Sequence, residues 1–142
     1  MTLAVVILTH NEERHIARAL ASVAGIATEV FVVDSFSTDR TAELSQAQGA
    51  IVLQNKFINY ARQFQWALDN APITAPWTMR LDADEVIEAD LAVRIRDELP
   101  HLPGDVVGIN LKRKHIFLGR WIRHGGRYPL VPLRIRRRGP GR

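Results

Sequence analysis

Short apolar runs alternate along this chain with segments in which apolar residues recur at helical spacing. The apolar runs predict strands over residues 3–9, 29–34, 50–54 and 77–82. Helical spacing predicts helices over residues 11–25, 39–49, 59–71 and 90–99. Strands that alternate with helices are joined by right-handed crossovers, so we expect a mainly parallel sheet with helices on both faces. The predicted fold class is α/β, and a chain of 142 residues fits a single domain.

The predicted helix over residues 39–49 carries signals at both ends. Ser37 or Thr38 is expected to cap its first turn, because a hydroxyl accepts a hydrogen bond from a free backbone N–H there. Gly49 is expected to end the helix, because glycine tolerates the left-handed conformation of a helix terminus.

The pattern changes after residue 105. Residues 106–118 and 128–138 look like strands, no helical pattern separates them, and Gly125 and Gly126 indicate a turn between them. We therefore expect an antiparallel or mixed edge to follow the parallel core.

Polar residues follow three of the predicted strands directly. These segments are THNE at 9–12, DSFSTD at 34–39 and DADE at 82–85. In an open parallel sheet, ligands bind beyond the carboxyl ends of the strands, so the three segments are expected to converge on one cleft. Asp34, Asp82 and Asp84 would gather carboxylates there, and such oxygen ligands suit Mg²⁺ or Mn²⁺ carried by a phosphorylated ligand. The expected ligand is a metal-bound nucleotide.

Composition narrows the cellular setting. The chain has no cysteine, which excludes disulfides and thiolate metal sites and fits a reducing compartment. It has no apolar run of the roughly eighteen residues that a membrane span needs, so an integral membrane protein is not expected. A cytoplasmic location is therefore the default expectation.

The net charge of +4 conceals an asymmetry along the chain. Residues 1–105 contain 8 Lys and Arg against all 15 Asp and Glu, whereas residues 106–142 contain 11 Lys and Arg and no acidic residue. Such a basic segment attracts the phosphates of nucleic acid, anionic lipid or substrate. A solvated basic tail without a partner is the plain alternative.

Four segments at compatible spacing resemble the successive motifs of the family 2 inverting glycosyltransferases with the GT-A fold. They are VVILTHNEERHIARALASV, VFVVDSFSTDRTAELSQAQGA, NYARQFQWALDNA and WTMRLDADE. The resemblance runs over residues 3 to about 138, and the tail FLGRWIRHGGRYPLVPLRIRRRG is similar to that of the bacterial lipopolysaccharide-core glucosyltransferase branch. It implies transfer of a hexose from a UDP-sugar, with inversion, to a glycan or glycolipid acceptor such as lipopolysaccharide core.

The resemblance also implies roles for residues around the nucleotide. Thr9, Asn11 and Glu12 match the loop that lines the nucleotide pocket. Asp34 matches the acid that reads the uracil edge, and Arg62 matches a basic residue over the pocket. Arg62 would fit an exposed helix surface equally well.

Asp82 and Asp84 match the two acids of the DxD motif. The resemblance implies that Asp82 lies near the ribose and sugar, and that Asp84 ligates the Mg²⁺ or Mn²⁺ bridging the diphosphate. Residues 1–105 would then form the nucleotide-binding core, and residues 106–142 the strands on the acceptor side.

Two features depart from the family pattern. Phe36 and Arg40 stand where glycine is common, so the loop after the second strand is not expected to adopt positive φ there without strain. No Asp or Glu follows Asp105, and relatives continue beyond this length. The chain is therefore expected to end before its catalytic base, which leaves the catalytic residue unknown.

Other functions stay open beside the sugar transferase. A nucleoside diphosphate-binding module without turnover would fit a chain that lacks the base. The basic segment at 112–142 could instead dock a peripheral protein on the anionic face of the inner membrane, or bind nucleic acid, which is the less favoured partner. An exposed sheet edge could also pair with a second copy to give a homodimer. His10 and His15 are expected to be structural or exposed, not ligands of a metal or nucleotide.

Overall fold

The structure is a computed structural model that describes residues 3–112, 117–123 and 134–138. The first eight elements are β1 Leu3–Thr9, α1 Ile16–Val23, β2 Glu29–Asp34, α2 Thr41–Ala47, β3 Ile51–Gln54, α3 Tyr60–Asn70, β4 Trp77–Asp82 and α4 Ala89–Glu98. A short 3₁₀ helix η1 Leu99–His101 and the strands β5 Val106–Lys112, β6 Phe117–Arg123 and β7 Ile135–Arg137 follow. The alternating α/β order predicted for the first hundred residues is confirmed.

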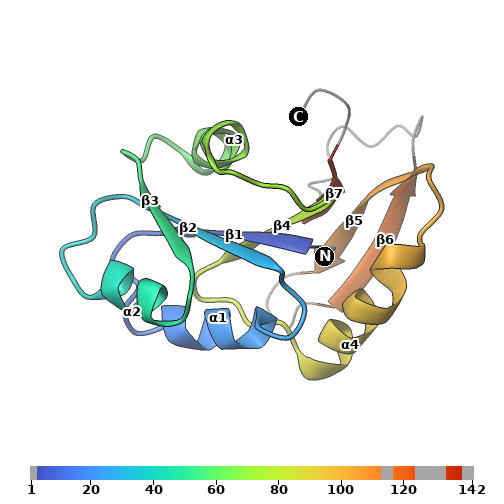
Figure 1. Ribbon diagram of the computed structural model, residues 1–142, viewed down its shortest axis with the longest axis horizontal. Coiled ribbons are helices and arrows are strands. Elements are labelled where there is room, and N and C mark those ends of the chain that lie inside the picture. Colours follow the sequence, from blue (N-terminus) through green and yellow to red (C-terminus); the bar gives the residue numbers. More distant parts are fainter. Residues whose placement is uncertain (1–2, 113–116, 124–133, 139–142) are drawn as a thin grey trace.

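Helices cover both faces of the sheet (Figure 1). Every residue of β1 is buried, because this strand lies between β2 and β4 and both of its faces are covered. Leu3, Val5 and Ile7 pack in the cluster that includes α1 and α4, while Ala4 and Val6 pack in the cluster that includes α3. In Figure 1, α1, α2 and α4 lie below the sheet and α3 lies above it.

The described part of the sheet has seven strands in the order β3-β2-β1-β4-β7-β5-β6. Strands β1 to β4 pair in parallel, whereas β7 is antiparallel to both β4 and β5, and β6 is antiparallel to β5. The mixed edge is therefore confirmed. The single strand expected over residues 106–118 is wrong, because β5 and β6 are separate antiparallel strands. Gly125 and Gly126 lie outside the described residues.

The ends of α2 correct one expectation and confirm another. Neither Ser37 nor Thr38 caps the helix; instead, Asp39 Oδ1 accepts a hydrogen bond of 2.9 Å from the Thr41 N–H. Gly49 follows the helix with φ of 89°, a conformation that costs glycine little. Within the described residues, no helix combines the length and apolar character that crossing a bilayer requires.

Candidate functional site

A pocket of about 480 Å³ opens at the carboxyl ends of β1 and β2. Its walls come from the loops after β1, β2 and β3 and from the start of α3. The residues that line it are Leu8, Thr9, His10, Glu12, Ser35, Phe36, Lys56, Phe57 and Tyr60. It therefore lies where the strand-end rule places ligands in a parallel α/β sheet.

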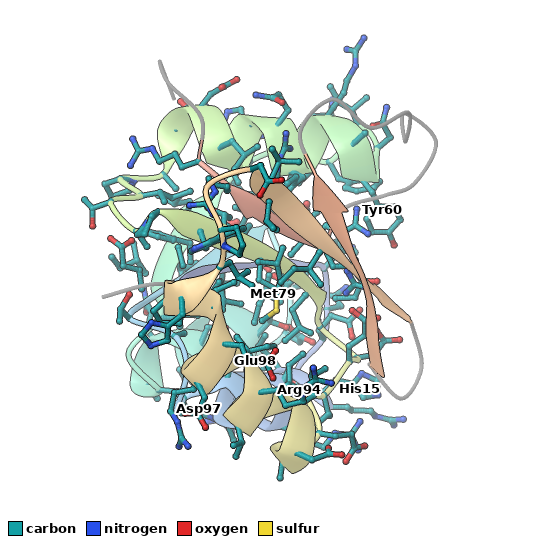
Figure 2. The ribbon with its side chains drawn as sticks, turned by 90° about the vertical axis from the view of Figure 1, so that its right-hand side faces the viewer. His15, Tyr60, Met79, Arg94, Asp97 and Glu98 are labelled. Atoms are coloured by element: carbon teal, nitrogen blue, oxygen red, sulfur yellow. The ribbon has the colours of Figure 1, made fainter. Side chains whose placement is uncertain are left out.

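Exposed aromatic side chains form one wall of the pocket. The rings of Phe57 and Tyr60 meet edge to face, with centroids 5.2 Å apart and an interplanar angle of 73°. Both rings are exposed, as is Phe36, and Tyr60 projects from the start of α3 (Figure 2). Exposed aromatics beside a concave surface suit a flat ligand that stacks on them.

Asp34 lies beneath the pocket, fully buried at the end of β2. Its Oδ1 accepts hydrogen bonds from the Thr9 hydroxyl at 2.6 Å and the Ser37 hydroxyl at 2.5 Å, and its Oδ2 accepts one from the Ser37 N–H at 2.9 Å. Burial raises the pKa of this carboxyl, but the hydrogen bonds from Ser37 and Thr9 outweigh it and hold the pKa below its ordinary value. Asp34 is therefore an ionised group that ties the ends of β1 and β2 together.

The loops after β1 and β2 are joined by hydrogen bonds between backbone and side chains. Asn11, at φ of 54°, donates its N–H to the Ser37 hydroxyl at 2.8 Å and accepts from the Thr38 N–H at 2.9 Å. The Glu12 N–H donates to the Thr41 hydroxyl at 2.8 Å. These hydrogen bonds hold the two loops at the pocket rim together without any bound ligand.

A second polar network fastens α3 to the same rim. Gln63 is buried, and its side-chain amide donates to Ser35 Oγ and to the Asn55 carbonyl, each at 3.1 Å. The Asn55 side chain returns a hydrogen bond of 2.8 Å to Gln63 Oε1. The His10 Nδ1 donates to the Ser35 carbonyl at 2.9 Å, so this histidine carries its proton on Nδ1.

The acidic residues after β4 stand beside this pocket. Leu8, which lines the pocket, is the register partner of Asp82 on the neighbouring strand. Asp82 is half-buried, and Asp84 is exposed in the turn that follows. The structure thus brings the ends of β1, β2 and β4 to one edge of the sheet.

The donor set fits a particular kind of metal binding. Among the described residues, no group of three His, Cys, Asp or Glu side chains converges. A site built on Asp82 and Asp84 would complete its coordination with ligand oxygens, as Mg²⁺ does when it binds through one or two carboxylates and a phosphorylated ligand. The residues therefore fit a divalent cation that arrives with a diphosphate, and they do not form a cage by themselves.

The residues that the sequence predicted to bind the nucleotide differ in how close they lie to the pocket. Thr9 and Glu12 line the pocket, whereas Asn11 lies in the joined loops and Asp34 lies beneath them. Asp34 is fully buried and is not among the lining residues, so its expected role in reading the edge of a base stays a prediction. Arg62 is exposed on α3 and is not among the lining residues.

Three pocket residues lie outside the segments that the sequence indicated, namely Lys56, Phe57 and Tyr60. All three follow β3, where the rule that ligands bind beyond strand ends points to residues 55–60. Ser35 lies in the expected segment 34–39. His10, which was expected to be structural or exposed, is exposed and lines the pocket.

The basic tail is partly structural where it is described. Arg134 is 3% exposed and forms an ion pair with Glu85. The Arg137 guanidinium stacks 4.3 Å from the centre of the Trp77 ring and donates to the carbonyls of Val106 and Pro103. Arg134 is therefore used inside the fold, whereas Arg137 is only partly buried and also lines a second pocket together with Arg136 and Arg138. The basic residues 113, 114 and 127 lie outside the described residues.

Comparison with known proteins gives consistent matches. The family model of glycosyl transferase family 2 matches residues 4–140. An uncharacterized glycosyltransferase of Rickettsia typhi is 36% identical over 96 residues, which are 68% of this chain and 31% of that protein. The lipopolysaccharide core biosynthesis glycosyltransferase LpsC of Rhizobium meliloti is 31% identical in an alignment that covers 100% of this chain and 53% of LpsC.

Among solved structures, the chain is similar to glucosyl-3-phosphoglycerate synthase from Mycobacterium tuberculosis. The crystal structure of its complex with Mn²⁺, uridine diphosphate and glucosyl-3-phosphoglycerate matches with a TM-score of 0.52 and 25% identity. The match covers 60% of this chain and 34% of the synthase. The same synthase has been crystallised with Mg²⁺ and uridine diphosphate.

Proposed function

The chain belongs to glycosyl transferase family 2, and on this premise we propose that it transfers a hexose from a UDP-sugar to a glycan or glycolipid. The transfer proceeds with inversion at the anomeric carbon. Lipopolysaccharide core is the proposed acceptor class, and the similarity to LpsC over the whole chain supports it.

The observation that carries the proposal is the adjacency of the aromatic pocket and the acidic turn. The pocket accepts the flat base, with Phe57 and Tyr60 available for stacking and Lys56 beside them. The diphosphate then extends from the end of β1 toward Asp82, the register neighbour of Leu8. One ligand with an aromatic head and a charged middle fits both features.

In this proposal Asp34 positions the binding loops without touching the nucleotide. Its carboxylate is fully engaged by Thr9 and Ser37, so it holds the loops after β1 and β2 in register. Thr9 and Glu12 present the polar groups of the rim, and the exposed nitrogen of His10, Nε2, is an acceptor in the neutral ring.

Asp84, assisted by Asp82, is the proposed ligand of Mg²⁺ or Mn²⁺. The cation supplies the positive charge that offsets the charge developing on the departing diphosphate. The complexes of the mycobacterial synthase with Mn²⁺ or Mg²⁺ and uridine diphosphate support this choice of cations. The exposed position of Asp84 leaves room for the oxygen atoms of the diphosphate.

Inversion in one displacement needs a base beside the acceptor hydroxyl. Asp34 and Glu85 are both buried and hydrogen-bonded within the protein, so neither is offered for that role. We place the acceptor on the side of the sheet formed by β5, β6 and β7, next to the acidic turn.

Calorimetric titration with a panel of nucleoside diphosphates and their sugars tests the proposal directly. We expect UDP and a UDP-hexose to bind more tightly than guanosine or adenosine analogues, and the binding to strengthen when Mn²⁺ is present. Equal affinity across the bases, or no effect of the metal, would contradict the proposal. Binding without sugar transfer to a lipopolysaccharide-core acceptor would select the non-catalytic module instead.

The loop after β2 offers a separate prediction, because Phe36 adopts φ of 51° despite its bulky side chain. The sequence led us to expect that this loop could not adopt positive φ at Phe36 without strain, and Phe36 does adopt a positive φ. A non-glycine residue in this region stores about 1–2 kcal/mol of strain. Arg40, the other residue at a common glycine position, has φ of −91° and carries no such strain.

Phe36→Gly should therefore raise the free energy of unfolding by up to about 1 kcal/mol, since the strain relieved exceeds the entropy that glycine loses. The same variant should bind UDP more weakly, because an aromatic wall of the pocket is removed. Phe36→Ala is the matched control: it removes the ring but keeps the strained backbone, so only UDP affinity should fall. Urea unfolding and UDP titration separate the two effects, and a less stable Phe36→Gly variant would contradict the strain.

A further inference from the structure

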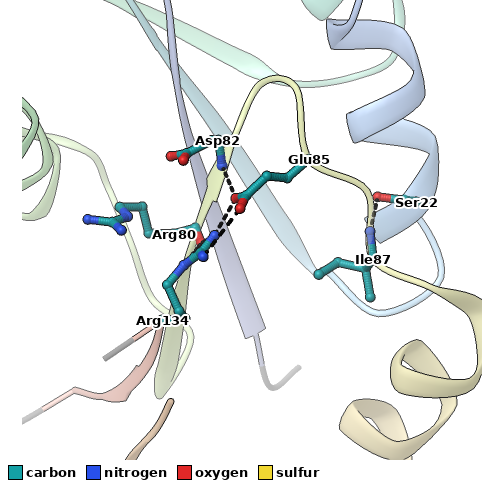
Figure 3. Close-up of polar contacts among 6 residues, drawn as sticks. All are labelled: Ser22, Arg80, Asp82, Glu85, Ile87 and Arg134. Atoms are coloured by element: carbon teal, nitrogen blue, oxygen red, sulfur yellow. Dashed lines mark hydrogen bonds and ion pairs between the residues drawn. The ribbon is translucent and has the colours of Figure 1, made fainter. Parts of the chain in front are cut away.

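The acidic turn after β4 is closed by Glu85 (Figure 3). The Glu85 N–H donates to the Asp82 carbonyl at 2.9 Å, which closes a four-residue turn over residues 82–85. The Glu85 side chain folds back in the other direction, and its Oε1 accepts from the Asp82 N–H at 2.8 Å. Both backbone polar groups of Asp82 are thus held by one residue, which is itself only 6% exposed.

Arg134 holds Glu85 in turn. Its Nη2 donates to Glu85 Oε1 and its Nη1 to Glu85 Oε2, the latter at 3.3 Å. Its Nε and Nη2 also donate to the Arg80 carbonyl at 3.2 and 3.1 Å. The planar guanidinium therefore binds the backbone near the end of β4 and the side chain that closes the acidic turn at the same time. Lysine does not reproduce this geometry.

The far end of the turn is fastened to α1. The Ile87 N–H donates to Ser22 Oγ at 3.1 Å, and Ser22 Oγ donates to the Ala19 carbonyl at 2.7 Å. The two ends of the segment are therefore fixed, while Asp84 between them is exposed. The Asp84 carboxylate is thus exposed to solvent on a backbone segment that is hydrogen-bonded on both sides of it.

Stability alone does not account for the buried ion pair. Replacing such a pair by apolar side chains of similar size is often neutral or even stabilising, because two charges must be taken out of water to form it. The contacts of this pair converge on the backbone of Asp82 and Arg80. We infer that Glu85 and Arg134 are positioning residues, which hold the turn so that Asp82 and Asp84 are pre-arranged to bind the cation and diphosphate. The inference rests on the proposed function, since it takes the turn as the metal site.

The proposed metal site would then depend on the C-terminal strands, because they hold Arg134 in place. Arg134 immediately precedes β7, its carbonyl accepts from the Arg80 N–H at 2.8 Å, and its N–H donates to the Ile109 carbonyl at 3.0 Å. The backbone of Arg134 is thus fixed between β4 and β5, independently of the contacts that its side chain makes with Glu85. The acidic motif and a residue 49 positions away form one unit.

The test is the affinity of the full chain for Mn²⁺ in the presence of UDP, measured from the free Mn²⁺ signal in electron paramagnetic resonance. Arg134→Met should lower that affinity about 10- to 100-fold, the usual loss when a group supporting a metal ligand is removed. Arg134→Lys should lose less, because it keeps the charge but not the planar fork. Binding of UDP without metal should stay unchanged, because the pocket does not include these residues.

Arg134→Met leaves Glu85 buried without its partner and can unfold the protein, so a second variant is needed. Glu85→Gln combined with Arg134→Met removes both charges, should fold as judged by circular dichroism, and should still bind Mn²⁺ at least about 10-fold more weakly. The matched control is Glu98→Gln with Arg94→Met, which removes an exposed pair on α4 (Figure 2) and should leave Mn²⁺ affinity unchanged.

A folded double variant with the Mn²⁺ affinity of the wild type would overturn the positioning role. If the wild-type chain binds UDP but takes up no Mn²⁺ with it, the metal site of the proposed function is at fault. The two failures are thus distinguished by the behaviour of the wild type.

Discussion

Asp84→Asn should lower sugar transfer at least about 100-fold, because a cation at a developing negative charge contributes several kcal/mol to the transition state. Asparagine keeps the size of the side chain but removes the charge that the proposed metal site requires. Asp84 is exposed, so the fold should tolerate the change. The variant should also lose the increase in UDP affinity that Mn²⁺ gives, while metal-free UDP binding is retained.

The control for this experiment is Asp97→Asn, the same chemical change at an exposed position of α4 (Figure 2). It should leave both transfer and Mn²⁺ binding as in the wild type. If folded Asp84→Asn keeps the Mn²⁺ affinity of the wild type, Asp84 is not the metal ligand. If it fails to fold, the residue has a structural role that its exposure does not indicate.

Asp34→Ala should lower the free energy of unfolding by about 3 kcal/mol. The change removes a buried carboxylate and leaves the Thr9 hydroxyl and the Ser37 N–H without their acceptor, and hydrogen bonds to charged groups contribute about 1.5–3 kcal/mol each. Asp39→Ala, in the same loop, is the comparison: it removes a solvent-accessible group that caps α2 and should cost about 1 kcal/mol. Urea unfolding measures both losses.

The same variant separates a positioning role from a base-reading role. Asp34 lies beneath the pocket, so a folded Asp34→Ala variant should lose affinity for uridine and guanosine diphosphates by the same factor. A loss confined to the uridine nucleotide would restore the interpretation that this carboxylate reads the base.

The depressed pKa of Asp34 adds a pH dependence. Since the folded-state pKa lies below the unfolded value of 3.8, the ionised carboxylate contributes its full stability above pH 3.8. That contribution is lost as the pH falls through the folded-state pKa. Urea midpoints should therefore fall below about pH 4 in the wild type and fall less steeply in Asp34→Asn, where this group does not titrate. Parallel curves would contradict the shift.

The parallel core was predictable because burial on both faces leaves a plain pattern. The strands over residues 3–9, 29–34 and 77–82 were predicted to the residue, since each is a mainly apolar segment that ends at a polar side chain. The C-terminal strands were not, because their pairing depends on distant partners. β7 has only three residues and inserts between β4 and β5, and no local pattern indicates such a neighbour.

The segments that form the candidate site were predictable from the sequence, but the burial of their individual side chains was not. Sequence shows which residues follow a strand, so the segments at 9–12, 34–39 and 82–85 could be assigned to one edge of the sheet. It does not show whether a side chain turns into the protein or out to the ligand. Asp34 and Glu85 both turn inward, each because donors from another element meet it there.

The position of β7 also sets the order in which the protein assembles. During synthesis, β5 and β6 emerge before β7, yet in the described sheet they reach β4 only through β7. The contact between Arg80 and Arg134 spans 54 positions, and closures of that length are slow compared with local helix and hairpin formation. We expect the nascent chain to hold an open β4 edge, with an acidic turn that has no arginine to shape it, until residues 134–137 leave the ribosome. The pocket at the ends of β1 and β2 would form first, and the turn beside it last.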